Sequence, residues 1–206
     1  LLLAGRAPLW WFIPAKREHD YKDYAAILLG KRFLRSADVI DFGGVDRIPT
    51  SEFTGAGIWQ LYKAIESPYK SVLKLLLLEC YASEDKGSSP LSMDFKQHIY
   101  DGMLNINELD PYVVVYRQLE HYLRGRKESR RLELLRRCFY FKVNKPLTRA
   151  SKGRSKSWQR QMLEKLTREW GWSREHLLLL DGRPTWKAQH VMTERKTVVS
   201  ELTNSY

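Results

Sequence analysis

Two lysines, Lys70 and Lys74, are the residues whose type and spacing point most directly to chemistry. In a helix, residues four apart lie on one face, so the two ammonium groups would lie one turn apart. Ser67 and Pro68 precede them and suit the start of a helix as capping residue and first-turn proline. A helix N-terminus already favours phosphate, so this pattern would suit a triphosphate group. The alternative is that both lysines simply extend from a helix end into water.

The stretch that must position these lysines runs from Ile58 to Ala82 and indicates two helices hinged at Ser67-Pro68. The second helix contains four consecutive leucines, 75–78, and is apolar on nearly every side, which is typical of a buried central helix. Two cations at the start of a buried helix need either an anionic partner or a route to water. This conflict makes the second helix the first candidate for a functional element.

Asp110 is a second candidate, because it stands before Pro111 in the same arrangement as Ser67-Pro68. That context predicts an N-cap, with a catalytic carboxylate as the alternative. The five histidines show neither HxH nor HExxH spacing, so zinc is not expected. The chain also contains no Asp-x-Asp, whereas a two-metal phosphoryl-transfer centre needs closely spaced carboxylates. The sequence therefore predicts no metal site within this chain.

The positive charge of the chain is concentrated in one quarter of it. The 206 residues carry a net charge of +11, and residues 121–170 hold sixteen Lys and Arg against four Asp and Glu. Such a block suggests a nucleic acid, an acidic partner or phosphate. Arg136 and Arg137 adjoin Phe139 and Tyr140, which could stack on bases, but these aromatics follow the helical core period and are expected to be buried. A non-catalytic basic helical module that binds nucleic acid or an acidic partner, or a merely solvated face, stays open.

The remaining patterns indicate a mainly α protein, a multi-helix bundle with at most one or two short strands near the N-terminus. The best strand candidate is the short apolar run Leu9–Ile13, which could equally be a buried extended segment. Residues 147–157 are basic, small and polar, and we expect a mobile loop there. Helical patterns cover residues 20–35, 51–65, 68–82, 92–100, 111–123, 132–143, 158–170 and 173–180, and Pro184 is expected to open the last helix.

Cys80 and Cys138 lie within apolar helical patterns without CxxC spacing, so we expect buried thiols in a reducing compartment. No apolar run approaches the length needed to cross a bilayer, and a cytoplasmic location is expected. The chain begins Leu-Leu-Leu-Ala-Gly without an initiator Met, which predicts that it starts in the middle of a larger protein.

Several segments of the chain together form a recognisable series. They are LAG at 3–5, LWW..P at 9–14, HDYKDY at 19–24, DFGG at 41–44, EFTGAGIWQLYKAIESPYKSVLKLLLLECY at 52–81, LDPY at 109–112, LLRRCFYFKV at 134–143, EWGW at 169–172 and LDGRPTWK at 180–187. These segments resemble the class I adenylate cyclases of bacteria, in the family's order and over nearly the whole chain. The resemblance implies that residues 1–14 end an upstream nucleotidyltransferase-like palm and that residues 15–206 form the helical domain that follows a palm.

This resemblance implies conversion of ATP into 3′,5′-cyclic AMP and pyrophosphate, with Mg²⁺ held mainly by carboxylates outside this chain. The fragment alone would then be inactive, and its partners would be ATP, the upstream palm and a downstream regulatory region, with nucleic acid not expected. The implied substrate-binding residues are Ser67, Tyr69, Lys70 and Lys74, with Asp110 and Arg6 as weaker candidates. Arg6 stands where the family typically has Lys, so its planar fork changes the geometry of any phosphate contact.

Overall fold

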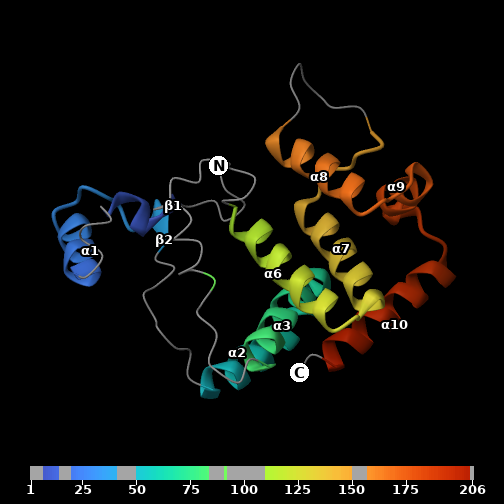
Figure 1. Cartoon of the computed structure of the whole chain (residues 1–206), viewed down its shortest axis with the longest axis horizontal. Coiled ribbons are helices and arrows are strands. Elements are labelled where there is room, and N and C mark those ends of the chain that lie inside the picture. The colour runs from blue at the N-terminus through green and yellow to red at the C-terminus, as the bar shows by residue number, and fades with distance from the viewer. Residues whose placement is uncertain are drawn as a thin grey trace. The chain divides into compact units, whose positions relative to one another are not determined.

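The described part of the chain is mainly α-helical (Figure 1), as the sequence predicts. The computed structural model describes residues 7–13, 20–40, 50–83, 91, 110–149 and 157–204. None of the described helices is both long and apolar enough to cross a membrane. The elements are β1 (Ala7–Pro8), η1 (Leu9–Phe12), α1 (Tyr21–Gly30), β2 (Val39–Ile40), α2 (Thr50–Lys63), α3 (Pro68–Ser83), α6 (Pro111–Gly125), α7 (Ser129–Val143), α8 (Trp158–Glu169), α9 (Arg174–Asp181), η3 (Arg183–Thr185) and α10 (Ala188–Asn204), where η marks a 3₁₀ helix.

The chain divides into two compact units. Unit 1 comprises Leu1–Glu52 and Tyr81–Gln118, and unit 2 comprises Phe53–Cys80 and Leu119–Tyr206. The dividing lines fall within α2, α3 and α6, so each of these helices contributes residues to both units. The assignment of residues 1–14 to a palm and of 15–206 to a helical domain stays a prediction.

Unit 1 contains the two short strands, which pair in parallel through Ala7 with Val39 and Pro8 with Ile40. The predicted strand at Leu9–Ile13 is wrong in its detail, because residues 9–12 form the 3₁₀ helix η1 directly after β1. The cause is that a short apolar run lacks the periodicity that would separate a strand from a helical turn. Leu9 and Ile13 are nevertheless both buried, at 3% exposure.

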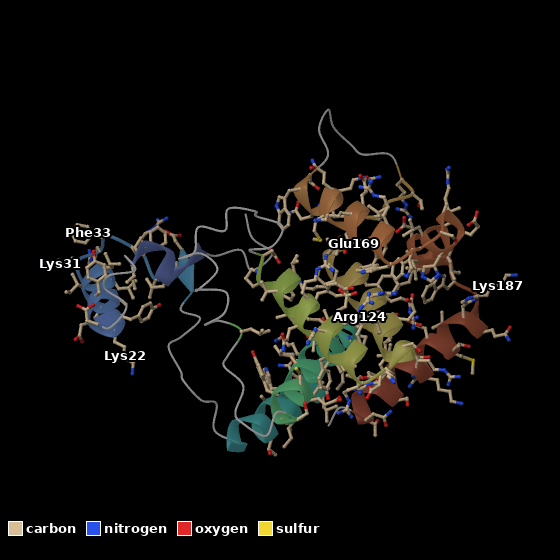
Figure 2. All side chains as sticks on the ribbon, in the orientation of Figure 1. Lys22, Lys31, Phe33, Arg124, Glu169 and Lys187 are labelled. Carbon is tan, nitrogen blue, oxygen red and sulfur yellow. The ribbon has the colours of Figure 1, made fainter. Side chains whose placement is uncertain are left out.

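A small core holds unit 1 together, and α1 supplies its helical side. Tyr21 and Ala25, one turn apart on α1, are buried in a cluster with Leu9, Ile13 and Val39. Partly buried side chains pack against this cluster, namely Tyr24, Leu28, Leu29, Leu34 and Val114. The surface of α1 that faces away from this cluster is exposed, and so is the turn after α1. Figure 2 shows this for Lys22, Lys31 and Phe33.

Unit 2 is a helical bundle built around α3 and α7 (Figure 1). Leu75, Leu76 and Cys80 of α3 are almost fully buried, which confirms that this helix belongs to the core. Cys138 and Phe139 of α7 have no exposed surface. Both cysteines are free and buried, as the sequence predicts.

The ends of the helices follow mostly from local chemistry. The Ser173 hydroxyl accepts the backbone N–H of His176 at 3.2 Å and caps α9, close to the start expected for a helix over 173–180. Gly171, with φ +69°, takes the left-handed conformation that commonly ends a helix, and it lies just after the end of α8. The prediction that Pro184 opens the last helix is wrong, because Pro184 lies in η3 and the extended residue Trp186 separates η3 from α10. The predicted helix at 92–100 lies outside the described residues.

Candidate functional site

The junction between α2 and α3 has the predicted form. After α2 ends at Lys63, the Ser67 N–H donates to the Lys63 carbonyl at 3.0 Å and closes a turn. Helix α3 then begins at Pro68, and the Ser71 N–H donates to the Ser67 carbonyl at 3.0 Å. Ser67 itself is exposed at this start. The hinge therefore presents the first turns of α3 to solvent on one side and to the core on the other.

Lys70 and Lys74 lie on the exposed side of α3, while Val72, Leu73 and Leu76 are buried. The conflict in the sequence is thus resolved, because the lysines reach water and the apolar residues fill the core. Within the described part of the chain, neither ammonium group forms an ion pair. Partial burial, and then the charge of Lys70, lower the pKa of Lys74. Two neighbouring cations without a carboxylate partner form a positive site suited to an anion.

Tyr69 faces a different environment from the two lysines. Its ring centroid lies 4.7 Å from that of Phe141, and the guanidinium carbon of Arg183 lies 4.6 Å from the Tyr69 ring and 5.0 Å from the Phe141 ring. Burial, followed by the charge of Glu194, raises the pKa of Tyr69 to about 12. The four predicted residues are therefore divided, with Tyr69 in contact with Phe141 and Arg183 and the lysines in solvent.

Tyr69 and Arg183 form part of the wall of a groove of about 630 Å³ in unit 2. This volume is within the roughly 300–1,000 Å³ typical of small-molecule sites. Most of its lining is apolar, and it includes Leu61, Ile65, Trp186, Val198 and Val199, with Arg183, Glu194 and Arg195 as charged members. Sequence reasoning missed this groove. Arg183 and Trp186 both lie in the LDGRPTWK segment between two helices, and residues in such connections often carry function.

Asp110 has the geometry of a helix cap. One of its carboxylate oxygens accepts the N–H groups of Tyr112 at 2.9 Å and Val113 at 3.3 Å, and the residue is fully buried. This is the first of the two roles that the sequence left open, and contact with a nucleotide stays a prediction. Arg6 lies outside the described residues.

The basic block uses several of its arginines inside the protein. Arg136 pairs with Glu120 and Glu133, and Arg137 pairs with Glu194. Their side chains are only 14% and 17% exposed. Phe139 and Tyr140 are buried, as expected from their helical period. These four residues, which carried part of the nucleic-acid hypothesis, are therefore occupied within the fold. The other basic residues of that hypothesis, Lys152, Arg154 and Lys156 of the expected loop, lie outside the described residues.

The 147–157 segment is described only in part, and its described residues are held by hydrogen bonds. The Leu147 N–H donates to the Tyr140 hydroxyl at 3.2 Å, and the Thr148 N–H donates to Asp181 at 2.8 Å. Residues 150–156 lie outside the described residues, so a mobile loop there stays a prediction.

The described residues contain no group of three His, Cys, Asp or Glu side chains that could hold a metal ion.

Comparison with known proteins shows which family the chain belongs to. The family profile described as "Adenylate cyclase, class-I, second domain" matches residues 48–206. The adenylate cyclase of Yersinia intermedia is 39% identical over 204 residues, which cover 99% of this chain and 24% of that protein. Those of Salmonella typhimurium (strain LT2) and Escherichia coli (strain K12) are each 38% identical with the same coverage. The chain thus spans about a quarter of the length of these curated relatives. No solved structure matches it.

Proposed function

Because this chain belongs to the class I adenylate cyclase family, we propose that it is part of an enzyme that converts ATP into 3′,5′-cyclic AMP and pyrophosphate. Its role in that enzyme is to bind the substrate. The observation that carries this proposal is the pair Lys70 and Lys74, two exposed cations near the start of α3. In the described part of the chain, neither ammonium group has a carboxylate partner.

The reaction gives these cations a defined task. It joins the ribose 3′ oxygen to the α-phosphorus and breaks the bond between that phosphorus and the oxygen of the leaving pyrophosphate. Negative charge therefore accumulates on the β- and γ-phosphates as the bond breaks. Lys70 and Lys74 would neutralise that charge, and such stabilisation lowers the barrier when it is stronger in the transition state than in the bound substrate. A positive helix N-terminus beneath them would act in the same direction.

The other predicted residues have weaker support. Ser67 is exposed at the start of α3, and in this proposal its hydroxyl contacts the same phosphates. Tyr69 would contribute through the groove, where a flat base could pack against its ring. Asp110 and Arg6 remain proposals drawn from the family resemblance. Nucleotidyltransferase-like chemistry of this kind uses Mg²⁺, and we assign no step to it because the described residues supply no set of metal ligands.

We further propose that the catalytic carboxylates and the Mg²⁺ ions are held by an upstream palm, and that a regulatory region follows this chain in the same cytoplasmic protein. The relatives are about four times as long as this chain, which leaves room for both parts. The alternative of a basic module for nucleic acid is not favoured, because Arg136 and Arg137 are paired with glutamates.

The test of this function is steady-state kinetics of the full-length protein with ATP. In the double variant Lys70→Ala/Lys74→Ala, we expect kcat/KM to fall by about tenfold for each charge-assisted contact that is lost. The matched control is Lys187→Ala, which removes an exposed lysine just before α10 (Figure 2). Unchanged kinetics in the double variant would show that the two lysines only extend into solvent.

A second measurement tests whether the catalytic carboxylates lie in the proposed palm and not in this chain. The isolated 206 residues should produce no cyclic AMP from ATP and Mg²⁺, whereas the full-length protein should produce it. Cyclic AMP formation by the isolated chain would contradict the proposal that the catalytic carboxylates lie elsewhere.

A further inference from the structure

A second, smaller hollow lies in unit 2 between the end of α7 and the start of η3. Its volume is about 200 Å³. Three cationic side chains line it, Lys145, Arg149 and Arg183, together with the amide of Asn144 and one carboxylate, Asp181. Lys145 and Arg149 belong to the basic block at 121–170, whereas Arg183 lies outside it. Arg183 also lines the larger groove, so the two hollows share one residue.

The segment that carries Lys145 and Arg149 is fixed by hydrogen bonds from three sides. Asp181, only 9% exposed, accepts the Tyr140 hydroxyl at 2.6 Å, the Thr148 N–H at 2.8 Å and the Thr148 hydroxyl at 2.7 Å. From α8, Arg160 donates to the carbonyls of Pro146, Leu147 and Arg149 at 2.7–2.8 Å. The backbone that holds the two cations is therefore preorganised, so a ligand would not have to order it on binding.

The ion pairing of these three cations differs from that of neighbouring arginines. Arg124, Arg131, Arg136, Arg137 and Arg160 each pair with at least one glutamate. Within the described residues, by contrast, neither Lys145 nor Arg149 nor Arg183 forms an ion pair.

The described contacts of the two arginines leave most of their donors available. Arg149 makes one long bond, 3.5 Å, from a terminal nitrogen to the Asp181 carbonyl. The guanidinium carbon of Arg183 lies 4.6 Å from the Tyr69 ring and 5.0 Å from the Phe141 ring, and in the described part of the chain none of its five N–H groups forms a hydrogen bond. An anion in the hollow could therefore receive hydrogen bonds from both guanidinium groups.

We propose that this hollow is an anion subsite that binds a phosphate group through Lys145, Arg149 and Arg183. Three positive charges around one shielded carboxylate suit a group with at least two negative charges, and guanidinium forks match phosphate oxygens in pairs. The volume is below the roughly 300–1,000 Å³ that enclose a drug-sized ligand, so the hollow holds a phosphate and not a whole nucleotide.

The phosphate has two possible sources, a free inorganic phosphate or pyrophosphate, and the terminal phosphate of a nucleotide. The subsite involves neither Lys70 nor Lys74, and it does not depend on the proposed cyclase activity. Its test can therefore succeed or fail independently of that activity.

The test is calorimetric titration of the full-length protein at low ionic strength with inorganic phosphate, pyrophosphate and ATP as separate probes. Lys145→Gln/Arg149→Gln removes two of the cations. Lys165→Gln/Lys187→Gln is the matched control, because both lysines are exposed in unit 2 and line neither hollow. Lys70→Gln/Lys74→Gln is titrated in parallel, and thermal unfolding verifies that every variant folds.

In the wild type we expect pyrophosphate to bind, and Lys145→Gln/Arg149→Gln to weaken that binding about tenfold for each cation removed. The control should retain this binding. Lys70→Gln/Lys74→Gln should lose only the part of pyrophosphate binding that belongs to the proposed ATP site, and should keep the part that depends on Lys145 and Arg149. Binding of inorganic phosphate alone at similar strength would identify a free ion as the ligand, whereas tighter ATP binding that also depends on Lys145 and Arg149 would identify a nucleotide. The proposal is overturned if no probe binds the wild type, or if Lys145→Gln/Arg149→Gln binds as the control does.

Discussion

Arg131 of α7 is surrounded by three glutamates, and replacing it tests whether this cluster holds unit 2 together. Its guanidinium donates to Glu201 of α10 at 2.7–3.1 Å, to Glu128 at 2.5 Å and to both carboxylate oxygens of Glu79 of α3. The side chain is 21% exposed and Glu201 is 5% exposed. Arg131 therefore joins three elements at a place where water reaches the charges poorly.

Replacing this arginine with methionine keeps much of its apolar stem but leaves three carboxylates close together. We expect Arg131→Met to lower the free energy of unfolding by about 2–4 kcal/mol, somewhat below the roughly 3–5 kcal/mol lost when one partner of a fully buried pair is removed. Arg130→Met is the matched control, because Arg130 is exposed on the same helix. That substitution should change stability by less than about 0.5 kcal/mol. Urea unfolding followed by tryptophan fluorescence gives both values.

The effect of Arg131→Met should also depend on pH. Burial raises the pKa of Glu128, but hydrogen bonds from Arg126 and Arg131 outweigh it, so the pKa is lowered on balance. A lowered carboxylate pKa stabilises the fold above the pKa of the unfolded state, and this stabilisation is lost as pH falls through the folded pKa. The difference in free energy of unfolding between the wild type and Arg131→Met should therefore become smaller at acid pH. This reasoning would be refuted if Arg131→Met lowered the free energy of unfolding by less than about 1 kcal/mol at neutral pH. It would also be refuted if the difference between wild type and variant were the same at acid pH.

Three further predictions concern single residues. Asp110→Ala should lower stability by about 1–2 kcal/mol in urea unfolding, since it removes the cap of α6, and an unchanged midpoint would contradict that role. Tyr69 has a folded pKa of about 12 against an ordinary value of 10.0, so stability should fall as pH rises through that window. Tyr69→Phe should make the fall shallower, and an identical slope would contradict the assignment. Cys80 and Cys138 are fully buried, and burial raises the pKa of Cys138, so neither thiol should react with an aromatic disulfide before denaturant is added. Rapid labelling of the native protein would contradict this.

The local features of the fold could be predicted from the sequence because they depend on neighbouring residues. Ser67-Pro68 marks the start of α3, Asp110-Pro111 marks the start of α6, and the apolar period of α7 identifies its buried face. The same reasoning failed at Leu9–Ile13 and at Pro184, where short segments carry no period and two kinds of turn fit equally well.

The contacts between distant segments could not be predicted in this way. Arg131 meets Glu79 and Glu201 across separations of 52 and 70 residues, and nothing in the local sequence selects those partners. The contact of Arg183 with the Tyr69 ring likewise joins residues far apart in the sequence. Of the predicted site, the exposed lysine pair followed from helical spacing, whereas the two hollows required the tertiary structure.

The central claim, that Lys70 and Lys74 contact the triphosphate of ATP, can be tested by lysine acetylation of the full-length protein read by mass spectrometry. Lys74 should react readily without ATP, because its lowered pKa leaves more of the amine neutral. With saturating ATP, we expect the acetylation of Lys70 and Lys74 to fall by about tenfold, while the exposed residues Lys165 and Lys187 react as before. Equal acetylation of Lys70 and Lys74 with and without ATP would contradict the claim.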